Sequence, residues 1–202
     1  LSSLSAAETR CAVLEVFVKG TADKSAEARE WVEKTYGKRP GLKIAIRDVV
    51  ESEEDLDRYW EIAEAFKIAN PGLPAFYVSG KFEYGWDAAT TPTRIDELLT
   101  VEVFVRNGCP RCAQAKPIIF NQLAPMYPGY KFVEKEILSV PANNQRLYEL
   151  AAKYRQAAAS VPALHYCGKL QIGFYDPNTS LKQWDDVLKA VTVPCTPAVA
   201  PP

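Results

Sequence analysis

Two cysteines separated by two residues are the residues of this chain best suited to chemistry. Cys109 and Cys112 enclose Pro110 and Arg111, directly after a short run of β-branched and aromatic residues. Such a pair can form and break a disulfide, and it can also supply half of a four-ligand zinc site. The predicted helices and strands around the pair help to distinguish these two chemistries.

The chain contains an internal repeat. Matching segments recur at an offset of 87 or 88 residues: Leu14–Ala28 with Val101–Ala115, Pro40–Val50 with Pro128–Leu138, and Leu73–Asp87 with Val161–Asp176. We therefore expect two copies of one fold, over residues 11–99 and 100–192, followed by a Pro/Ala-rich linker or tail over 193–202.

Each copy shows the same order of predicted elements, β-α-β-α-β-β-α. Apolar runs and alternating patterns predict strands at Val13–Val18, Leu42–Ile46, Val101–Val105 and Tyr130–Val133. Helical spacing predicts helices at Glu53–Ile68, Pro92–Leu99, Asn143–Tyr154 and Ser180–Val191. The βαβ order favours parallel strands and the final pair a hairpin, which gives an α/β fold with mixed sheets flanked by helices.

This order places the cysteine pair where a strand leads into a helix. Backbone N–H groups and the helix dipole stabilise a thiolate there and lower the pKa of the first cysteine. Arg106 and Arg111 are expected to stabilise the Cys109 thiolate further. Cys112, one turn into the helix, is placed to attack a mixed disulfide formed at Cys109.

The second half resembles the glutaredoxin-type members of the thioredoxin superfamily. The resemblance rests on Cys109–Cys112, Pro117, Ser160–Pro162, Arg106 and the loop Gly173–Asp176. It implies two tandem thioredoxin-like domains, a cis peptide bond before Pro162, and substrate binding at Val161 and Pro162. It also implies that Arg106 faces glutathione. The absence of Trp before Cys109, and Val103 at the place of a buried acid, make the thioredoxin subclass less fitting.

The first copy resembles the second but lacks its cysteines. Ala22–Ser25 lies over Cys109–Cys112, so this copy cannot exchange disulfides, whereas Leu73 and Pro74 keep the proline position. Tandem arrays such as protein disulfide isomerases and archaeal protein disulfide oxidoreductases also pair catalytic with non-catalytic copies. The first copy therefore either binds a partner or serves packing alone.

The remaining cysteines and the single histidine leave alternatives open. A zinc site would have to draw on Cys11, Cys167, Cys195 and His165, since the chain has no second pair at this spacing. Cys11 and Cys195 flank the copies and could pair with each other or with another chain. Cys167 is expected to be a small buried residue or a third redox partner, and His165 a packed strand residue or a proton shuttle.

Composition and charge limit the classes of partner that the protein is expected to bind. The 202 residues carry a net charge of −1, which excludes a strongly basic nucleic-acid binder, but residues 1–100 have a net charge of −5 and residues 101–202 of +4. The missing initiator methionine and the Pro/Ala-rich tail suggest a segment of a longer protein. We expect an extracytoplasmic or periplasmic location, with the cytoplasm as the alternative, and the sequence leaves the oligomeric state undetermined.

The sequence therefore predicts a thiol–disulfide oxidoreductase that acts on protein thiols and disulfides through Cys109 and Cys112. Neither a metal nor an organic cofactor is expected, whereas glutathione is a candidate co-substrate and a membrane redox protein a candidate partner. The alternatives are a glutathione-dependent glutaredoxin, a non-catalytic peptide-binding or chaperone module, and a zinc-binding pair. The direction of electron flow depends on a partner outside this chain.

Overall fold

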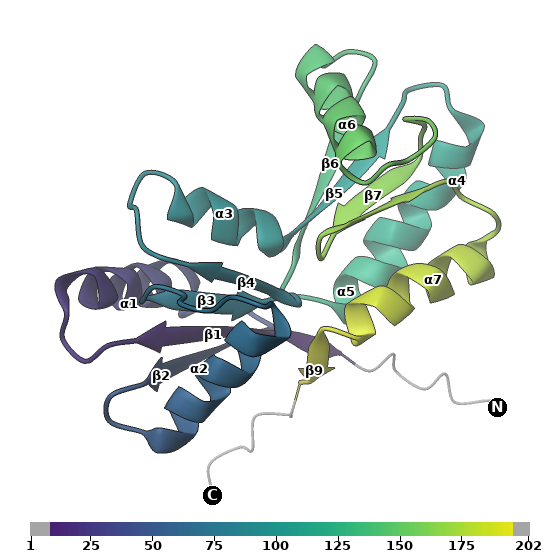
Figure 1. The fold of residues 1–202 in the computed structure, drawn as a ribbon. Coiled ribbons are helices and arrows are strands. Elements are labelled where there is room, and N and C mark those ends of the chain that lie inside the picture. The colour runs from purple at the N-terminus through teal and green to yellow at the C-terminus, as the bar shows by residue number, and fades with distance from the viewer. Residues whose placement is uncertain (1–8, 196–202) are drawn as a thin grey trace, which may run out of the picture.

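The computed structural model describes residues 9–195, which fold around two β-sheets (Figure 1). The first half supplies the strands β1 (Arg10–Val18), β2 (Leu42–Asp48), β3 (Ala75–Val78) and β4 (Lys81–Tyr84). The second half supplies β5 (Thr100–Val105), β6 (Lys131–Glu136), β7 (Ala163–Tyr166), β8 (Lys169–Ile172) and β9 (Thr192–Pro194). The strand orders β2-β1-β3-β4 and β6-β5-β7-β8 are the same in the two halves.

The helices also repeat. The first half contains α1 (Asp23–Tyr36), α2 (Glu53–Ala65) and α3 (Thr91–Leu98). The second half contains α4 (Pro110–Ile118), a π-helical turn η1 (Ile119–Leu123), α5 (Ala124–Met126), α6 (Pro141–Lys153) and α7 (Pro177–Lys189). The predicted α/β fold of two thioredoxin-like domains is confirmed, with element ends that differ from the predicted ones by a few residues.

Each sheet combines parallel and antiparallel pairs. β1 runs parallel to β2 and β5 parallel to β6, since a helix connects the two strands of each pair. β3 and β4 form a hairpin, as do β7 and β8. Both hairpin turns have positive φ at their two central residues, Ser79-Gly80 and Cys167-Gly168, which is the geometry that matches the strand twist.

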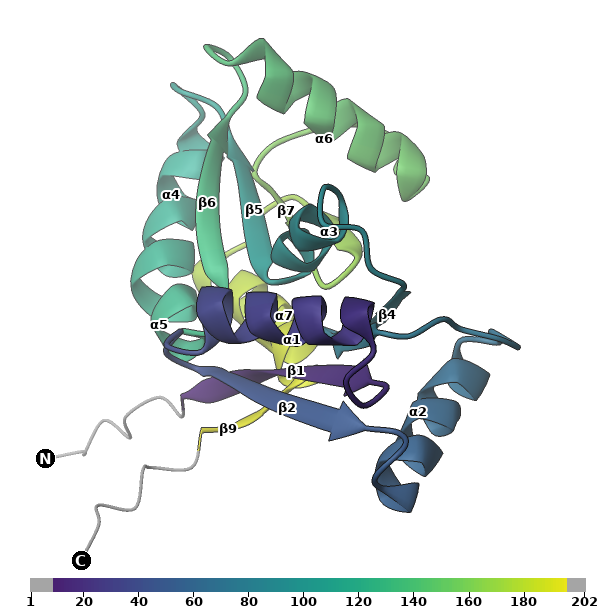
Figure 2. The ribbon, with the colours of Figure 1, turned by 90° about the vertical axis from the view of Figure 1, so that its left-hand side faces the viewer.

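Helices cover both faces of each sheet. Apolar residues of β1, α1 and α3 pack on one face of the first sheet, whereas Tyr59, Ile62 and Ala63 of α2 pack on the other with Phe17. In the second half α4 and α7 share one face, and Leu147 of α6 covers the opposite face with Phe104. Figure 2 shows α1 beside β1 and β2, and α6 at the far end of the second half.

The two halves share one core cluster, which extends from Leu14 and Val32 to Val103 and Trp184. Polar contacts cross between them: Ser79 Oγ lies 2.9 Å from Tyr130 Oη, and the Arg146 guanidinium lies 3.7 Å from a carboxylate oxygen of Glu97. The halves therefore pack against each other through apolar and polar contacts alike.

The end of the second half returns to the first sheet. β9 pairs antiparallel with the start of β1, and a disulfide joins Cys11 to Cys195. The tail expected at 193–202 thus begins within a strand, and residues 196–202 lie outside the described residues. Of the two pairings that the sequence left open for Cys11 and Cys195, the structure has the one within the chain.

Candidate active site

The cysteine pair lies where β5 leads into α4. Cys109 is the N-cap residue of α4, and Pro110 occupies the first turn, where no backbone N–H is needed. The Cys109 sulfur accepts a hydrogen bond from the backbone N–H of Cys112 at 3.2 Å, and both thiols are free. The start of the helix thus places N–H groups and the positive end of its dipole at Cys109.

The two thiols differ in ionisation. Burial raises the pKa of Cys109, but hydrogen bonds from the Cys112 thiol and from the backbone N–H groups of Cys112 and Arg111, together with the charge of Arg106, bring this pKa below its usual value. Burial and the hydrogen bond to Cys109 raise the pKa of the Cys112 thiol to about 11. Cys109 is therefore the stronger nucleophile of the pair near neutral pH.

The two arginines that the sequence placed at the thiolate act differently. Arg106 is exposed, lines a hollow together with Cys109 and lowers the pKa of that thiol by its charge. Arg111 is also exposed, and it lowers the pKa of Cys109 through its backbone N–H. The charge contribution thus belongs to Arg106.

A hollow of about 400 Å³ opens beside Cys109. Its lining combines polar groups with apolar side chains: Arg106, Cys109, Ile137, Leu138, Asn144, Tyr148, Ala159, Ser160 and Val161. Leu138 and Tyr148 are 68% and 56% exposed, so the hollow has an apolar border that solvent reaches. An exposed apolar border next to a nucleophile suits an extended substrate with apolar side chains.

Of the two predicted substrate residues, one lines this hollow. Val161 lines it, Pro162 is the next residue and is buried, and the bond between them is cis. The carbonyl of Pro162 accepts a hydrogen bond from the N–H of Gly173 at 2.8 Å, which connects this strand start to the loop that precedes α7. Asp176 of that loop caps α7 by accepting bonds from Asn178 and Thr179.

Glu136 holds two loops of the site together. Its Oε1 accepts from the backbone N–H of Asn107 at 3.1 Å and of Leu138 at 3.0 Å, and its Oε2 accepts from the N–H and hydroxyl of Ser139. These bonds, those from Ser139 foremost, lower the pKa of Glu136 to about 2. The carboxylate therefore fixes Leu138 relative to the segment that leads into Cys109.

The first half has equivalent hydrogen bonds and an equivalent cis peptide bond, but it has no thiols at these positions. Asp48, at the position of Glu136, accepts from the N–H groups of Gly20 and Val50 at 3.2 and 3.0 Å. The bond between Leu73 and Pro74 is cis, as in the second half. Ser25, at the position of Cys112, is buried and accepts from the N–H of Lys19 at 3.0 Å.

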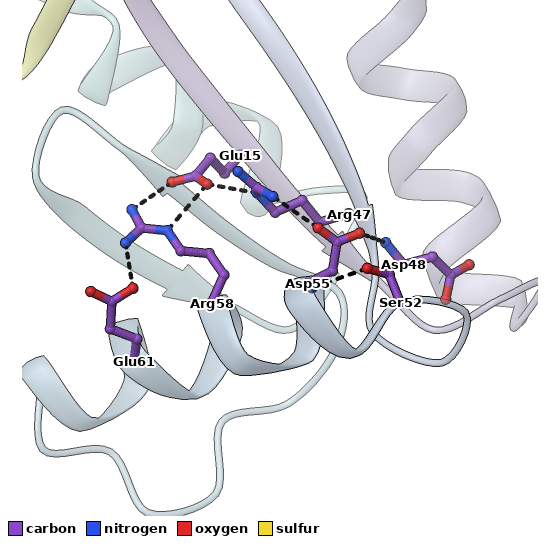
Figure 3. Close-up of polar contacts among 7 residues, drawn as sticks. All are labelled: Glu15, Arg47, Asp48, Ser52, Asp55, Arg58 and Glu61. Carbon is purple, nitrogen blue, oxygen red and sulfur yellow. Dashed lines mark hydrogen bonds and ion pairs between the residues drawn. The ribbon is translucent and has the colours of Figure 1, made fainter.

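Each half also contains a glutamate on its central strand, at positions that the repeat aligns; Glu15 is buried and Glu102 is partly buried. Glu15 accepts from Arg47 at 2.7 Å and from Arg58 at 3.0 Å; Figure 3 shows these two side chains converging on it from β2 and α2. Glu102 accepts from Arg146 at 3.3 Å and lies 2.8 Å from His165 Nδ1. Hydrogen bonding and positive charge outweigh burial and lower the pKa of Glu102. Sequence reasoning did not single out these networks, although the aligned glutamates were a signal for them.

The residues proposed for a zinc site have other partners. Cys11 and Cys195 are joined to each other, and His165 lies between Glu102 and Tyr154, whose hydroxyl is 3.1 Å from Nε2. Burial raises the pKa of the Cys167 thiol to about 11. Within residues 9–195, His, Cys, Asp and Glu form no group of three or more that could hold a metal ion.

Within residues 9–195, no helix is long and apolar enough to span a membrane. No family model matches the sequence, and a comparison with curated proteins finds no relative.

Solved structures that a comparison finds similar to the chain include the following two. One is the NTD_N/C domain of alkylhydroperoxide reductase AhpF from Enterococcus faecalis, with 12% identity and a TM-score of 0.29 over 88% of this chain and 92% of that one. The other is full-length ERdj5, with 12% identity and a TM-score of 0.32 over 91% of this chain and 27% of that one. The description of the fold of each half therefore rests on the strand order of its sheet and on the positions of its helices.

Proposed function

We propose that the protein is a thiol–disulfide oxidoreductase with Cys109 as nucleophile and Cys112 as resolving thiol. The observation that carries the proposal is the geometry of the pair: Cys109 lies at the helix start, accepts from the backbone N–H of Cys112 and borders the hollow, whereas Cys112 is buried one turn away. The directions of the two pKa shifts, downward for Cys109 and upward for Cys112, agree with it. A thiolate that borders a hollow meets a substrate first, and a buried thiol one turn away acts second.

The proposed exchange balances without a cofactor. The Cys109 thiolate attacks one sulfur of a substrate disulfide, a mixed disulfide forms, and the other substrate sulfur leaves as a thiolate that takes a proton from solvent. Cys112 then loses its proton and attacks the Cys109 sulfur, so that the second substrate thiolate leaves. The substrate gains two electrons and the Cys109–Cys112 pair is oxidised; the reverse sequence donates a disulfide.

Protein disulfides are the proposed substrates, because Leu138 and Tyr148 border the hollow on the side of α6. A glutathione-dependent glutaredoxin is the second candidate, and Arg106 supports it, since a guanidinium beside the nucleophile can pair with a glutathione carboxylate. The two candidates differ in their need for Cys112. A Cys112→Ser variant keeps activity on glutathione mixed disulfides under the second and stops at the mixed disulfide under the first.

We also propose that the protein works in an oxidising, extracytoplasmic compartment. The disulfide between Cys11 and Cys195 supports this location, because disulfides persist in secreted and periplasmic proteins and are rare in the reducing cytosol. Free thiols counted by mass spectrometry after rapid acid trapping in the native host test the location. Alkylated Cys11 and Cys195 in that sample would contradict it.

The function is tested by reaction of the reduced protein with a disulfide-bonded peptide, followed by mass spectrometry. We expect the wild type to reduce the peptide, Cys109→Ser to be inactive, and Cys112→Ser to accumulate a mixed disulfide at Cys109. Cys167→Ser is the matched control and is expected to react like the wild type, because Cys167 is 7% exposed and its pKa is raised. Full activity of Cys109→Ser would refute the proposal.

A further inference from the structure

The side chain of Arg111 has no partner in the part of the protein that the structure describes. Arg111 stands between the two cysteines in the first turn of α4, and it is exposed. Within residues 9–195 its guanidinium forms neither an ion pair nor a hydrogen bond. It acts on Cys109 through its backbone N–H. The charge of this side chain is therefore free to meet a molecule that approaches Cys109 from solvent.

A second unpaired guanidinium lies on the other side of the nucleophile. Arg106 is exposed and lines the hollow with Cys109, and its side chain likewise has no carboxylate partner among the described residues. Lys116, on the same helix as Arg111, is by contrast paired with Glu134 at 2.9 Å. Two guanidiniums that can each accept a carboxylate from outside thus flank Cys109 in sequence, three residues before it and two after it.

The carboxylates of the loops around the site are held by other donors. Glu136 accepts from backbone N–H groups and from the hydroxyl of Ser139. Asp176 accepts from two backbone N–H groups at the start of α7. Neither carboxylate pairs with Arg106 or Arg111, so both guanidiniums keep their capacity to bind an acid that a substrate supplies.

We propose that Arg111 selects substrates in which a carboxylate stands beside the disulfide, and that Arg106 adds to this preference. The inference rests on the proposed exchange at Cys109 and names its substrate class, which is acidic polypeptide segments that contain a disulfide. The carboxylate pairs with the guanidinium while apolar side chains of the segment contact Leu138 and Tyr148. The pairing favours the encounter and leaves the bonds that form and break unchanged.

The electrostatic part of the proposal can be tested without disulfide exchange. Iodoacetate and iodoacetamide both alkylate the Cys109 thiolate with loss of iodide, but only iodoacetate carries a negative charge near neutral pH. The ratio of the two rates, read at Cys109 by mass spectrometry, cancels the fraction of thiolate, so a change in the pKa of Cys109 does not affect it.

We expect Arg111→Gln to lower the ratio of the iodoacetate rate to the iodoacetamide rate by about threefold, the effect of a unit charge about 7 Å away in water. Lys24→Gln is the matched control, because Lys24 aligns with Arg111 at the offset of 87 residues and is also exposed. It removes the same charge from the half without thiols and should leave the ratio unchanged. An equal ratio in wild type and Arg111→Gln would overturn the proposal.

The substrate class is tested with disulfide-bonded peptides of equal length that share their apolar residues and carry Asp, Asn or Lys beside the cysteines. Each rate with the reduced protein is divided by the rate with dithiothreitol, an uncharged dithiol, to correct for the reactivity of the peptide itself. We expect the corrected rate of the Asp peptide to exceed that of the Lys peptide at least about tenfold, with the Asn peptide between them.

Arg111→Gln should reduce this difference between the peptides, and Arg111→Lys, which keeps the charge, should retain most of it. Equal corrected rates for the three peptides would overturn the selection of acidic substrates and leave the proposed exchange in place. No reduction of any peptide would overturn both proposals. The two failures are therefore distinguishable.

Oxidised glutathione is the other source of carboxylates close to a disulfide. We expect its corrected rate to be lower than that of the Asp peptide, because it has no apolar side chain to contact Leu138 and Tyr148 at the border of the hollow. A higher corrected rate for oxidised glutathione than for the Asp peptide would assign Arg111 to glutathione and overturn the choice of acidic polypeptides.

Discussion

Cys109 and Cys112 share one helical turn but differ in surroundings. Cys109 sits at the helix start beside Arg106 and the hollow, whereas Cys112 is only 2% exposed. The helix start and Arg106 favour the thiolate of Cys109, and burial favours the protonated form of Cys112. This division of roles follows from position and not from the cysteines themselves.

The effect of the Arg106 charge on the pKa of Cys109 can be tested directly. We expect Arg106→Gln to move the pKa of Cys109 upward, because the charge that favours the thiolate is removed, and so to slow its alkylation near neutral pH. The midpoint of the rate of iodoacetamide labelling against pH, read at Cys109 by mass spectrometry, measures the shift.

Arg111→Gln is the matched control for this change. It keeps the backbone N–H through which Arg111 acts on Cys109, so we expect a smaller shift. A larger shift with Arg111→Gln than with Arg106→Gln would show that the guanidinium of Arg111 is the stabilising group.

The reactive residues could be predicted from sequence because their spacing fixes their geometry. Two residues between cysteines after a strand place the first at a helix start and the second one turn in. Leu138, Tyr148 and Glu136 could not be predicted as site residues, since they approach Cys109 only through the pairing of β5 with β6 and the packing of α6. No local pattern encodes these contacts.

At the scale of elements, one carboxylate connects the start of α4 with the loop before α6. Glu136 accepts from Asn107 on one side and from Leu138 and Ser139 on the other. Its pKa of about 2 lies below that of an unfolded glutamate, so its stabilisation is present above about pH 4.3 and is lost as the pH falls toward 2.

We expect Glu136→Ala to loosen both loops and to slow exchange with a disulfide-bonded peptide. Amide hydrogen exchange at Asn107, Leu138 and Ser139 should become faster, because each amide loses its acceptor. Asp48→Ala, the aligned change, should speed exchange at Gly20 and Val50 and leave peptide reduction unchanged. Unchanged amide exchange in Glu136→Ala would contradict the role given to Glu136.

The internal repeat made most elements predictable, since each half confirms the pattern of the other. η1 and β9 were not predicted. Pro117 lacks an N–H and interrupts the hydrogen bonds of the helix shortly before η1. β9 forms only because a distant strand start, Arg10–Ala12, pairs with it, and no short-range pattern carries that information.

At the scale of the whole molecule, the two halves meet through a close approach of main chain. A Cβ on Gly129 would collide with the carbonyl oxygen of Gly41 and lie 3.0 Å from Ala12 Cβ. Tyr130, the next residue, contacts Ser79 across the same interface. The relative placement of the halves thus depends on the absence of a side chain at Gly129.

We expect Gly129→Ala to lower the free energy of unfolding by about 1–3 kcal/mol, because backbone must move to admit the methyl group. Gly72→Ala is the matched control, since a Cβ there meets nothing within 4 Å and its φ is not positive. Urea unfolding followed by circular dichroism measures both. Equal stability of Gly129→Ala and Gly72→Ala would show that the interface tolerates a wider separation.

The most direct test of the central claim is a redox titration of the Cys109–Cys112 pair. The protein is equilibrated in graded glutathione buffers, trapped by alkylation and analysed by mass spectrometry. We expect one two-electron transition that joins Cys109 to Cys112, with a midpoint between about −270 mV for a reductant and about −120 mV for a strong oxidant. If the two cysteines pair at no glutathione ratio, the assignment of a redox dithiol is wrong.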